Sequence, residues 1–142
     1  MALKIIDHGS HEYQQMIQMR TDILRKPLGL KLNPEELEKE KDEILIGAFD
    51  DEKMLGCCML VREDAKNCRL RQMAVLNNLQ GKGIGRALMN FAENIARDLG
   101  YRTITMHARK TAIGFYEKLG YTVVGNEFEE VTLPHFAMEK KL

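Results

Sequence analysis

The chain has 142 residues, enough for one domain with a buried core, so we expect a single domain over residues 1–142. Its 21 basic and 21 acidic side chains cancel, which argues against a nucleic acid or an anionic membrane as a partner. No apolar run approaches the roughly 20 residues that span a bilayer, and the first residues lack the apolar stretch of a secretory signal. Cys57, Cys58 and Cys68 have no Cys-x-x-Cys or metal-ligand spacing, so we predict reduced thiols, a cytoplasmic location and no metal.

The first half of the chain predicts a strand, two helices and three further strands. A strand is expected over residues 3–7, and Ser10 suits the N-cap of a helix whose apolar residues recur at helical spacing. Asn33 and Pro34 supply a cap and a proline at the first helical position, so a second, short helix begins there. Three apolar runs separated by polar turns predict an antiparallel meander at residues 43–49, 54–62 and 68–75.

A glycine-rich turn with the sequence Gln-Gly-Lys-Gly-Ile-Gly occupies residues 80–85, directly before a long amphipathic pattern. Glycines at alternate positions let backbone N–H groups turn inward, and a helix start adds unpaired N–H groups and the positive end of its dipole. The turn therefore predicts an anion site, for a phosphate or pyrophosphate. The helix after it is predicted to have one apolar face, made by Ile84, Leu88, Phe91, Ile95 and Leu99.

The last third of the chain predicts a strand, a short helix and two strands. Gly100 is suited to end the long helix in the left-handed conformation, and a strand is expected over residues 101–108. A short helix over about 110–119 ends in the same way at Gly120, and strands follow near residues 121–124 and 136–140.

The glycine turn by itself admits three interpretations. The dinucleotide fingerprint Gly-x-Gly-x-x-Gly fits Gly81 and Gly83 but has Arg86 in its third place, and it normally follows an early parallel strand. The phosphate loop of ATP- and GTP-binding proteins, with its Gly-Lys-Ser/Thr ending, is absent. The third interpretation is a tight strand-to-helix connection without a ligand, and the glycines alone leave it open.

The flanks of the turn resemble the GNAT superfamily of acyl-CoA-dependent N-acetyltransferases. The family signature [QR]-x-x-G-x-[GA] is matched by Gln80, Gly83 and Gly85. The family's second hallmark is an aromatic pair in a short helix that ends in a glycine followed by an aromatic residue. It is matched by Phe115, Tyr116, Gly120 and Tyr121. Residues 20–29 and 133–138 are similar to the ElaA-like branch. The resemblance implies an α/β (α+β) fold in which four helices flank a mixed, mostly antiparallel sheet of about seven strands, with a splayed central strand pair.

The resemblance also implies where acetyl-CoA binds. Its pyrophosphate would accept hydrogen bonds from backbone amides of the turn, with lesser help from the Lys82 and Arg86 side chains. The N–H of Met73 would face the acetyl carbonyl as an oxyanion donor, and Val75 would hold the pantetheine arm. The implied coenzyme-binding residues are Met73, Ala74, Val75, Gln80, Gly81, Lys82, Gly83, Ile84, Gly85 and Arg86.

In the family, a tyrosine at the place of Tyr116 is the usual acid. A tyrosine of pKa ~10 is a weaker acid than a thiol of pKa ~8.5, so full proton transfer to the leaving thiolate is uphill by about 2 kcal/mol. We therefore expect Tyr116 to hydrogen-bond the sulfur, and to donate its proton fully only if its pKa is lowered. An alternative is that Tyr116 is only an aromatic core residue beside Phe115.

The general base has less support in the sequence. Some family members use a glutamate on the strand before the turn, but its place falls near Arg69, which cannot act as a base. His107 and His135 are the remaining candidates, because a histidine side chain ordinarily titrates near neutrality. The alternative is that each is only a surface or hydrogen-bonded structural histidine. Glu129 and Glu130 are candidates for contacting a cationic amine.

The function implied by the resemblance is transfer of an acetyl group from acetyl-CoA to a primary amine through a tetrahedral intermediate. The first choice of acceptor is a small molecule and the second is a protein or peptide amine, with the pocket shaped by residues 25–32 and 126–133. A non-catalytic acyl-CoA sensor and a nucleotide-binding domain are the alternatives. Small family members often form homodimers, although no feature of this sequence fixes the oligomeric state.

Overall fold

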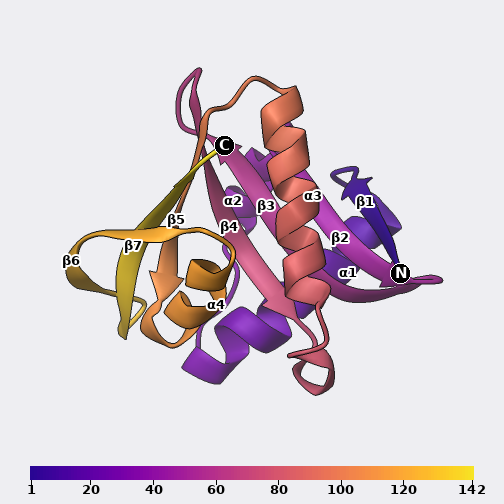
Figure 1. The fold of residues 1–142 in the computed structure, drawn as a ribbon. Helices are drawn as coiled ribbons and strands as arrows, with labels where there is room; N and C mark the ends of the chain where they lie inside the picture. The colour runs from indigo at the N-terminus through magenta and orange to yellow at the C-terminus, as the bar shows by residue number, and fades with distance from the viewer.

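The computed structural model describes all 142 residues, and one seven-stranded sheet organises them in the order β1-β2-β3-β4-β5-β7-β6 (Figure 1). The strands are β1 (Ala2–Ile6), β2 (Ile44–Asp50), β3 (Lys53–Arg62), β4 (Asn67–Val75), β5 (Thr103–Arg109), β6 (Thr122–Glu130) and β7 (Leu133–Lys141). The α-helices are α1 (His11–Arg20), α2 (Pro34–Lys39), α3 (Ile84–Asp98) and α4 (Ile113–Lys118). Only β4 and β5 are parallel neighbours, which confirms the mixed, mostly antiparallel sheet and the meander of β2, β3 and β4. No helix is both long and hydrophobic enough to span a bilayer.

Both predicted N-caps are present. The Ser10 side chain accepts a hydrogen bond from the Tyr13 N–H at 3.2 Å, and the Asn33 side chain accepts one from the Glu35 N–H at 2.9 Å. Each bond satisfies an amide that the first helical turn leaves without a partner. After α1 the chain does not form an open loop but continues through a π-helical turn, η1 (Thr21–Arg25), and a 3-10 turn, η2 (Lys26–Leu28).

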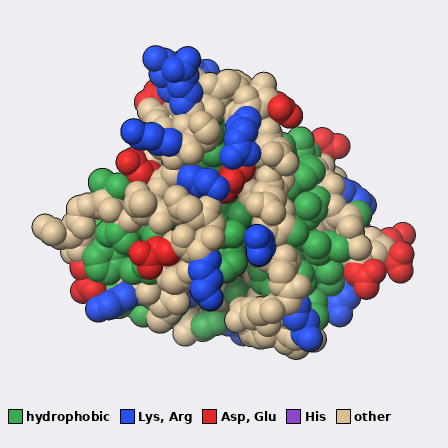
Figure 2. All heavy atoms as spheres, in the orientation of Figure 1, with side chains coloured by type: hydrophobic (Ala, Val, Ile, Leu, Met, Phe, Trp, Pro, Cys, Tyr) green, Lys and Arg blue, Asp and Glu red, His purple; other side chains and the backbone are tan.

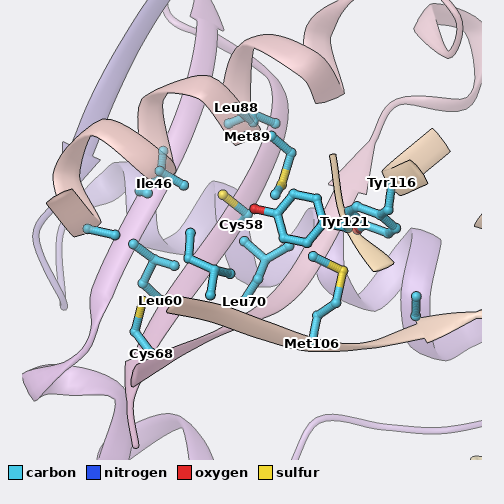
Figure 3. Close-up of a cluster of buried hydrophobic side chains, with 14 of the residues drawn as sticks. Ile46, Cys58, Leu60, Cys68, Leu70, Leu88, Met89, Met106, Tyr116 and Tyr121 are labelled. Carbon is cyan, nitrogen blue, oxygen red and sulfur yellow. The ribbon is translucent and has the colours of Figure 1, made fainter. Parts of the chain in front are cut away.

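Two hydrophobic cores lie on the two faces of the sheet, because alternate side chains of a strand point to opposite faces. On β3, Cys57 and Met59 pack toward α1, whereas Cys58 and Leu60 pack toward α3. The α3-side core also holds Tyr116 and Tyr121, which lie at one end of it beside Met106 (Figure 3).

The three cysteines are all free and buried in these cores, as the sequence predicts for reduced thiols. Burial raises the pKa of Cys57 to about 12 and that of Cys68 to about 11, and it raises the pKa of Cys58 as well. All three thiols are therefore protonated and unreactive near neutral pH.

The long helix follows the glycine turn as predicted, but the predicted set of residues on its apolar face is wrong in part. Ile84 and Leu88 are buried together with Met89, Ala92 and Ala96. Leu99 is 58% exposed, because α3 ends at Asp98 and the chain turns away at the left-handed Gly100. Phe91 and Ile95 pack against the core partly buried, so the predicted face is wrong only at Leu99 and omitted Met89 and the two small alanines.

The strand before the C-terminal turn is longer than expected. The sequence predicted a strand over residues 121–124 and a pocket loop from residue 126, but β6 continues to Glu130 and pairs with β7 on both sides of an irregularity after Val124. Gly125 adopts φ +82° at this irregularity. The irregularity interrupts the alternation by which strands are recognised in a sequence, and residues 126–130 are consequently strand.

A buried ion pair was not anticipated. Arg20, at the end of α1, donates two hydrogen bonds of 2.7 Å to the two carboxylate oxygens of Glu40, and the Tyr13 hydroxyl donates a third at 2.9 Å. Both charged side chains are almost fully buried. The bidentate geometry joins α1 to the turn after α2 and fixes the segment that leads into η1.

Candidate active site

The central strands β4 and β5 separate soon after they begin to pair. Their parallel register covers only Asn67–Arg69 against Thr103–Thr105, and Figure 1 shows the two strands diverging toward their C-terminal ends. On the other edge of β4, the register with β3 shifts between Cys57 and Met59, and Gln72 adopts φ +59° at this bulge. The predicted splayed pair is therefore present, and the last residues of β4 have a neighbouring strand on one edge only.

The bulge decides which backbone groups of β4 face the gap. The N–H of Leu76, just past the strand end, donates to the Leu55 carbonyl at 3.0 Å and so points toward β3. Because successive N–H groups of an extended strand point to opposite edges, those of Met73 and Val75 point away from β3, into the gap. The side chains of these two residues pack against the α3-side core, so packing and the orientation of the amides do not conflict.

The glycine turn lies at the end of this strand and begins α3. Gly81 and Gly83 have φ of +81° and +87°, and a side chain at either position would meet nothing within 4 Å. Gly83 is the N-cap of α3 and no side chain caps the helix, so the first helical amides have no side-chain partner there. Gln80 donates to the Val75 carbonyl at 3.3 Å, which ties the turn to β4. Open amides and space in front of them are what an anion requires.

Gly85 has a different role from the other two glycines. It is helical, and a Cβ there would lie 3.0 Å from a ring carbon of Phe115 in α4. The third glycine therefore lets α4 pack closely against the start of α3. Lys82 and Arg86 are exposed beside the turn.

Tyr116 enters the α3-side core from α4. The side chain is 6% exposed and its ring packs edge-on against Phe115 and Tyr121, with centroids 4.9 and 5.9 Å apart. Burial, with a smaller contribution from the nearby Cys58, raises the pKa of Tyr116 above its ordinary value. Full proton donation was expected only for a lowered pKa, so the structure leaves hydrogen bonding as the role open to this hydroxyl.

Glu130, which the sequence suggested as a contact for a cationic amine, lies between His107 and His135. The Nδ1 atom of His107 lies 2.9 Å from a carboxylate oxygen of Glu130 and 2.8 Å from the Nη2 atom of Arg69. A carboxylate only accepts and a guanidinium only donates, so one ring nitrogen cannot satisfy both partners. Burial would raise the pKa of Glu130, but its hydrogen bond to His107 and the charges of His107, His135 and Arg69 outweigh this effect and lower it.

Glu130 accepts a hydrogen bond only from the tautomer of His107 that carries a proton on Nδ1, whereas the Arg69 contact suits the opposite tautomer. In the tautomer that bonds Glu130, Nε2 is the nitrogen able to accept a proton. The His107 side chain is 34% exposed, so this nitrogen is within reach of a small molecule. A Glu130–His107 hydrogen bond in this tautomer has the arrangement of the carboxylate–histidine pair of a catalytic triad.

His135 is on the other side of the same carboxylate but is enclosed. Its side chain is 4% exposed, its Nδ1–H donates to the Leu133 carbonyl at 2.9 Å, and its Nε2 lies 3.7 Å from Glu130. Phe128 stacks on its ring at a centroid distance of 6.0 Å. His135 is therefore placed to support Glu130 rather than to meet an acceptor.

A family model described as an acetyltransferase (GNAT) domain matches residues 13–142. The chain belongs to the GNAT acetyltransferase family. Among curated relatives, the N-acetyltransferase YjcF of Bacillus subtilis is 27% identical over 139 residues, which cover 96% of this chain and 97% of YjcF.

Solved structures of GNAT proteins share the whole fold. Escherichia coli ElaA superposes with a TM-score of 0.82 at 16% identity, over 99% of both chains. An aminoglycoside 6'-N-acetyltransferase complexed with coenzyme A gives 0.80 at 19% identity, over 99% of this chain and 97% of that one. A GNAT acetyltransferase from Elizabethkingia anophelis with acetyl-CoA bound gives 0.75 at 16%, over 99% and 97%. At these identities the likeness establishes the GNAT fold and leaves the acceptor open.

Within the GNAT fold, the candidate residues fall on two faces of the sheet. Tyr116 and the glycine turn lie on the α3 side, whereas His107 alternates with the core residues Met106 and Ala108 and so lies on the α1 side. Figure 2, drawn from the α3 side, shows basic, acidic and apolar side chains intermixed and no histidine. The unpaired edge of β4 at Met73 and Val75 lies between the two groups of candidate residues.

Proposed function

We propose that this GNAT protein transfers an acetyl group from acetyl-CoA to the primary amine of a small molecule. The observation that carries the proposal is the pair of unpaired amides of Met73 and Val75 beside an open nest of helix-start amides at residues 81–86. Solved relatives that contain coenzyme A or acetyl-CoA support the choice of donor. The free edge of β4 suits an extended pantetheine chain, and the nest suits its pyrophosphate.

The chemistry requires three groups around the thioester. As the amine nitrogen attacks the carbonyl carbon, the oxygen gains negative charge, and the Met73 N–H is aimed at the place where it develops. The C–N bond forms, the ammonium proton leaves to Nε2 of His107, and the C–S bond then breaks with the electron pair on sulfur. The Tyr116 hydroxyl donates a hydrogen bond to the departing thiolate.

Energetics support an oriented histidine as a sufficient base. A lysine-like amine of pKa ~10.4 first loses one proton to water at pH 7, which costs about 4.6 kcal/mol, and the second proton, left on nitrogen when the C–N bond forms, is the one that His107 takes. This cost is well below the barrier reductions that enzymes achieve, so a base of ordinary strength suffices when it is oriented. The 2.9 Å bond to Glu130 supplies that orientation.

An acceptor panel tests the proposal. Purified protein is incubated with acetyl-CoA and single amines, including small metabolites and lysine peptides, and free CoA release is measured with mass spectrometry of the product. We expect amine-dependent CoA release and an acetylated small amine. Slow CoA release that no amine accelerates would overturn the enzyme in favour of an acyl-CoA sensor, and exclusive acetylation of peptides would overturn the small-molecule acceptor.

A further inference from the structure

Three arginines near the diverging ends of β4 and β5 form no ion pair. Arg25 ends η1, Arg71 lies on β4 just before the bulge, and Arg109 is the last residue of β5. The ion pairs of the chain involve other residues, and none of these three guanidinium groups is in one. Elsewhere, by contrast, the buried Arg20 has a bidentate carboxylate partner.

The sheet register places these arginines on the α1 face. Arg71 is paired with Met59, whose side chain is buried in the α1-side core, so both leave the sheet on that face. Arg109 is paired with His135, whose Nε2 lies 3.7 Å from Glu130. The turn η1, which ends at Arg25, packs against β4.

The three charges are close enough to affect one another. Burial lowers the pKa of Arg25, and the charges of Arg20 and Arg71 lower it further; Glu36 acts in the opposite direction, and Arg109 has the smallest lowering effect. Arg20 is already neutralised by Glu40. Arg25 and Arg109 are half-buried and Arg71 is exposed, and none of the three is in an ion pair, so each guanidinium group is available to an anion. Planar guanidinium groups bind carboxylates and phosphates with paired hydrogen bonds.

The position of the cluster assigns the anion to the acceptor rather than to the coenzyme. The glycine turn that suits the pyrophosphate is at the start of α3, which covers the opposite face of the sheet (Figure 1). An amine must reach the Met73 amide from the side that the coenzyme does not occupy, and His107 is on that side. A negative group at Arg71 and Arg109 therefore belongs to the molecule that carries the amine.

We infer that the acceptor is a small amine bearing an oxyanion, either a carboxylate or a phosphate, and that Arg25, Arg71 and Arg109 bind this group. The inference rests on the proposed acetyltransferase function and narrows its acceptor. It also replaces the expectation that Glu130 binds a cationic amine, because that carboxylate already holds His107.

Matched pairs of amines test the inference by turnover. The pairs are 5-aminopentanoate against pentylamine and 2-aminoethyl phosphate against ethanolamine, so that the two arms distinguish carboxylate from phosphate. We expect the preferred anionic amine to exceed its neutral partner in kcat/KM. Arg71→Gln and Arg109→Gln should each lower that value about ten- to hundredfold, because each removes charged hydrogen bonds. Arg62→Gln, an exposed arginine at the far end of β3, is the matched control and should change nothing.

Calorimetry of the same amines with the CoA-bound protein separates this inference from the proposed function. Tighter binding of an anionic amine that Arg71→Gln abolishes supports the inference even without turnover, in which case only the enzyme proposal fails. Equal reaction and binding of neutral and anionic amines, unaffected by the arginine variants, overturns the inference while acetyl transfer stands. Variants that raise the KM for acetyl-CoA instead would assign the arginines to the coenzyme and also overturn it. Binding of neither kind of amine by the CoA-bound protein overturns it as well.

Discussion

Replacing Gly83 with alanine tests whether the glycine turn is held in a conformation built to bind an anion. Gly83 has φ +87° and open space where a Cβ would be, so alanine meets no steric clash and only backbone strain counts. An L-residue in the left-handed region costs about 1–2 kcal/mol, and the lower entropy of the unfolded alanine chain offsets about 0.4–1 kcal/mol of that. We expect the free energy of unfolding to fall by about 1 kcal/mol.

The loss of coenzyme affinity should exceed this loss of stability. The strain is relieved when the chain leaves the left-handed region, and that movement turns the amides at the start of α3 away from the pyrophosphate. One charge-assisted hydrogen bond is worth about 1.5–3 kcal/mol, so CoA should bind roughly ten- to hundredfold more weakly. S-acetylpantetheine, which lacks the pyrophosphate, should lose much less.

Gly9→Ala is the matched control. Gly9 has φ +84° and the same open surroundings, but it lies between β1 and α1, away from the turn. Urea unfolding and calorimetric CoA titration of both variants give the two quantities. Both should lose similar stability, and only Gly83→Ala should lose affinity. Equal CoA affinity of the two variants, or equal weakening of CoA and S-acetylpantetheine, would refute the anion-nest argument.

Three further changes follow from the same structure. Tyr116→Phe should slow kcat about tenfold, the value of one hydrogen bond to a charged sulfur, without changing the KM for acetyl-CoA; an unchanged kcat in steady-state assays would remove Tyr116 from the mechanism. Glu130→Gln should lower kcat at least tenfold, because it removes the charge that favours the histidine tautomer with a proton on Nδ1, whereas Glu129→Gln next to it should not; equal effects would contradict this. Because the pKa of Glu130 is lowered in the folded protein, its ionised carboxylate stabilises the fold at pH values above the ordinary carboxyl pKa. This contribution is lost as the pH falls through the lowered pKa. The urea midpoint of Glu130→Gln should therefore approach that of the wild type in acid. Glu40→Gln should cost about 3–5 kcal/mol of unfolding free energy by leaving Arg20 buried and unpaired, and the Arg20→Met/Glu40→Leu double variant should recover most of it; a single variant as stable as the wild type would refute the pairing.

The features that the sequence predicted well are local ones. Ser10 and Asn33 cap helices through bonds that span two or three residues, and Gly100 and Gly120 adopt the left-handed conformation at helix ends. The splayed pair and the glycine turn were also anticipated, because a family resemblance carries the geometry of a backbone. These features need no knowledge of distant side chains.

The features that the sequence did not reveal depend on register between distant strands. Glu130 reaches His107 across 23 residues only because β6 pairs with β7 and β7 with β5. The bulge that frees the β4 amides is at Gln72, a residue type with no special preference for positive φ. The buried Arg20 resembled any polar residue at a helix end until its partner Glu40 was located.

The contrast between local features and features that depend on strand register also distinguishes the candidate donor site from the candidate acceptor site. The candidate donor site is made of backbone amides, so any sequence that keeps the glycines and the bulge can keep it while its side chains change. The candidate acceptor site is made of side chains from η1, β4 and β5, with His107 and Glu130 beside them. Similarity to solved structures at 16–22% identity therefore establishes the GNAT fold and is silent on the acceptor. Arg25, Arg71 and Arg109 are the side chains on which the inferred choice of an anionic amine rests, and their substitution tests it.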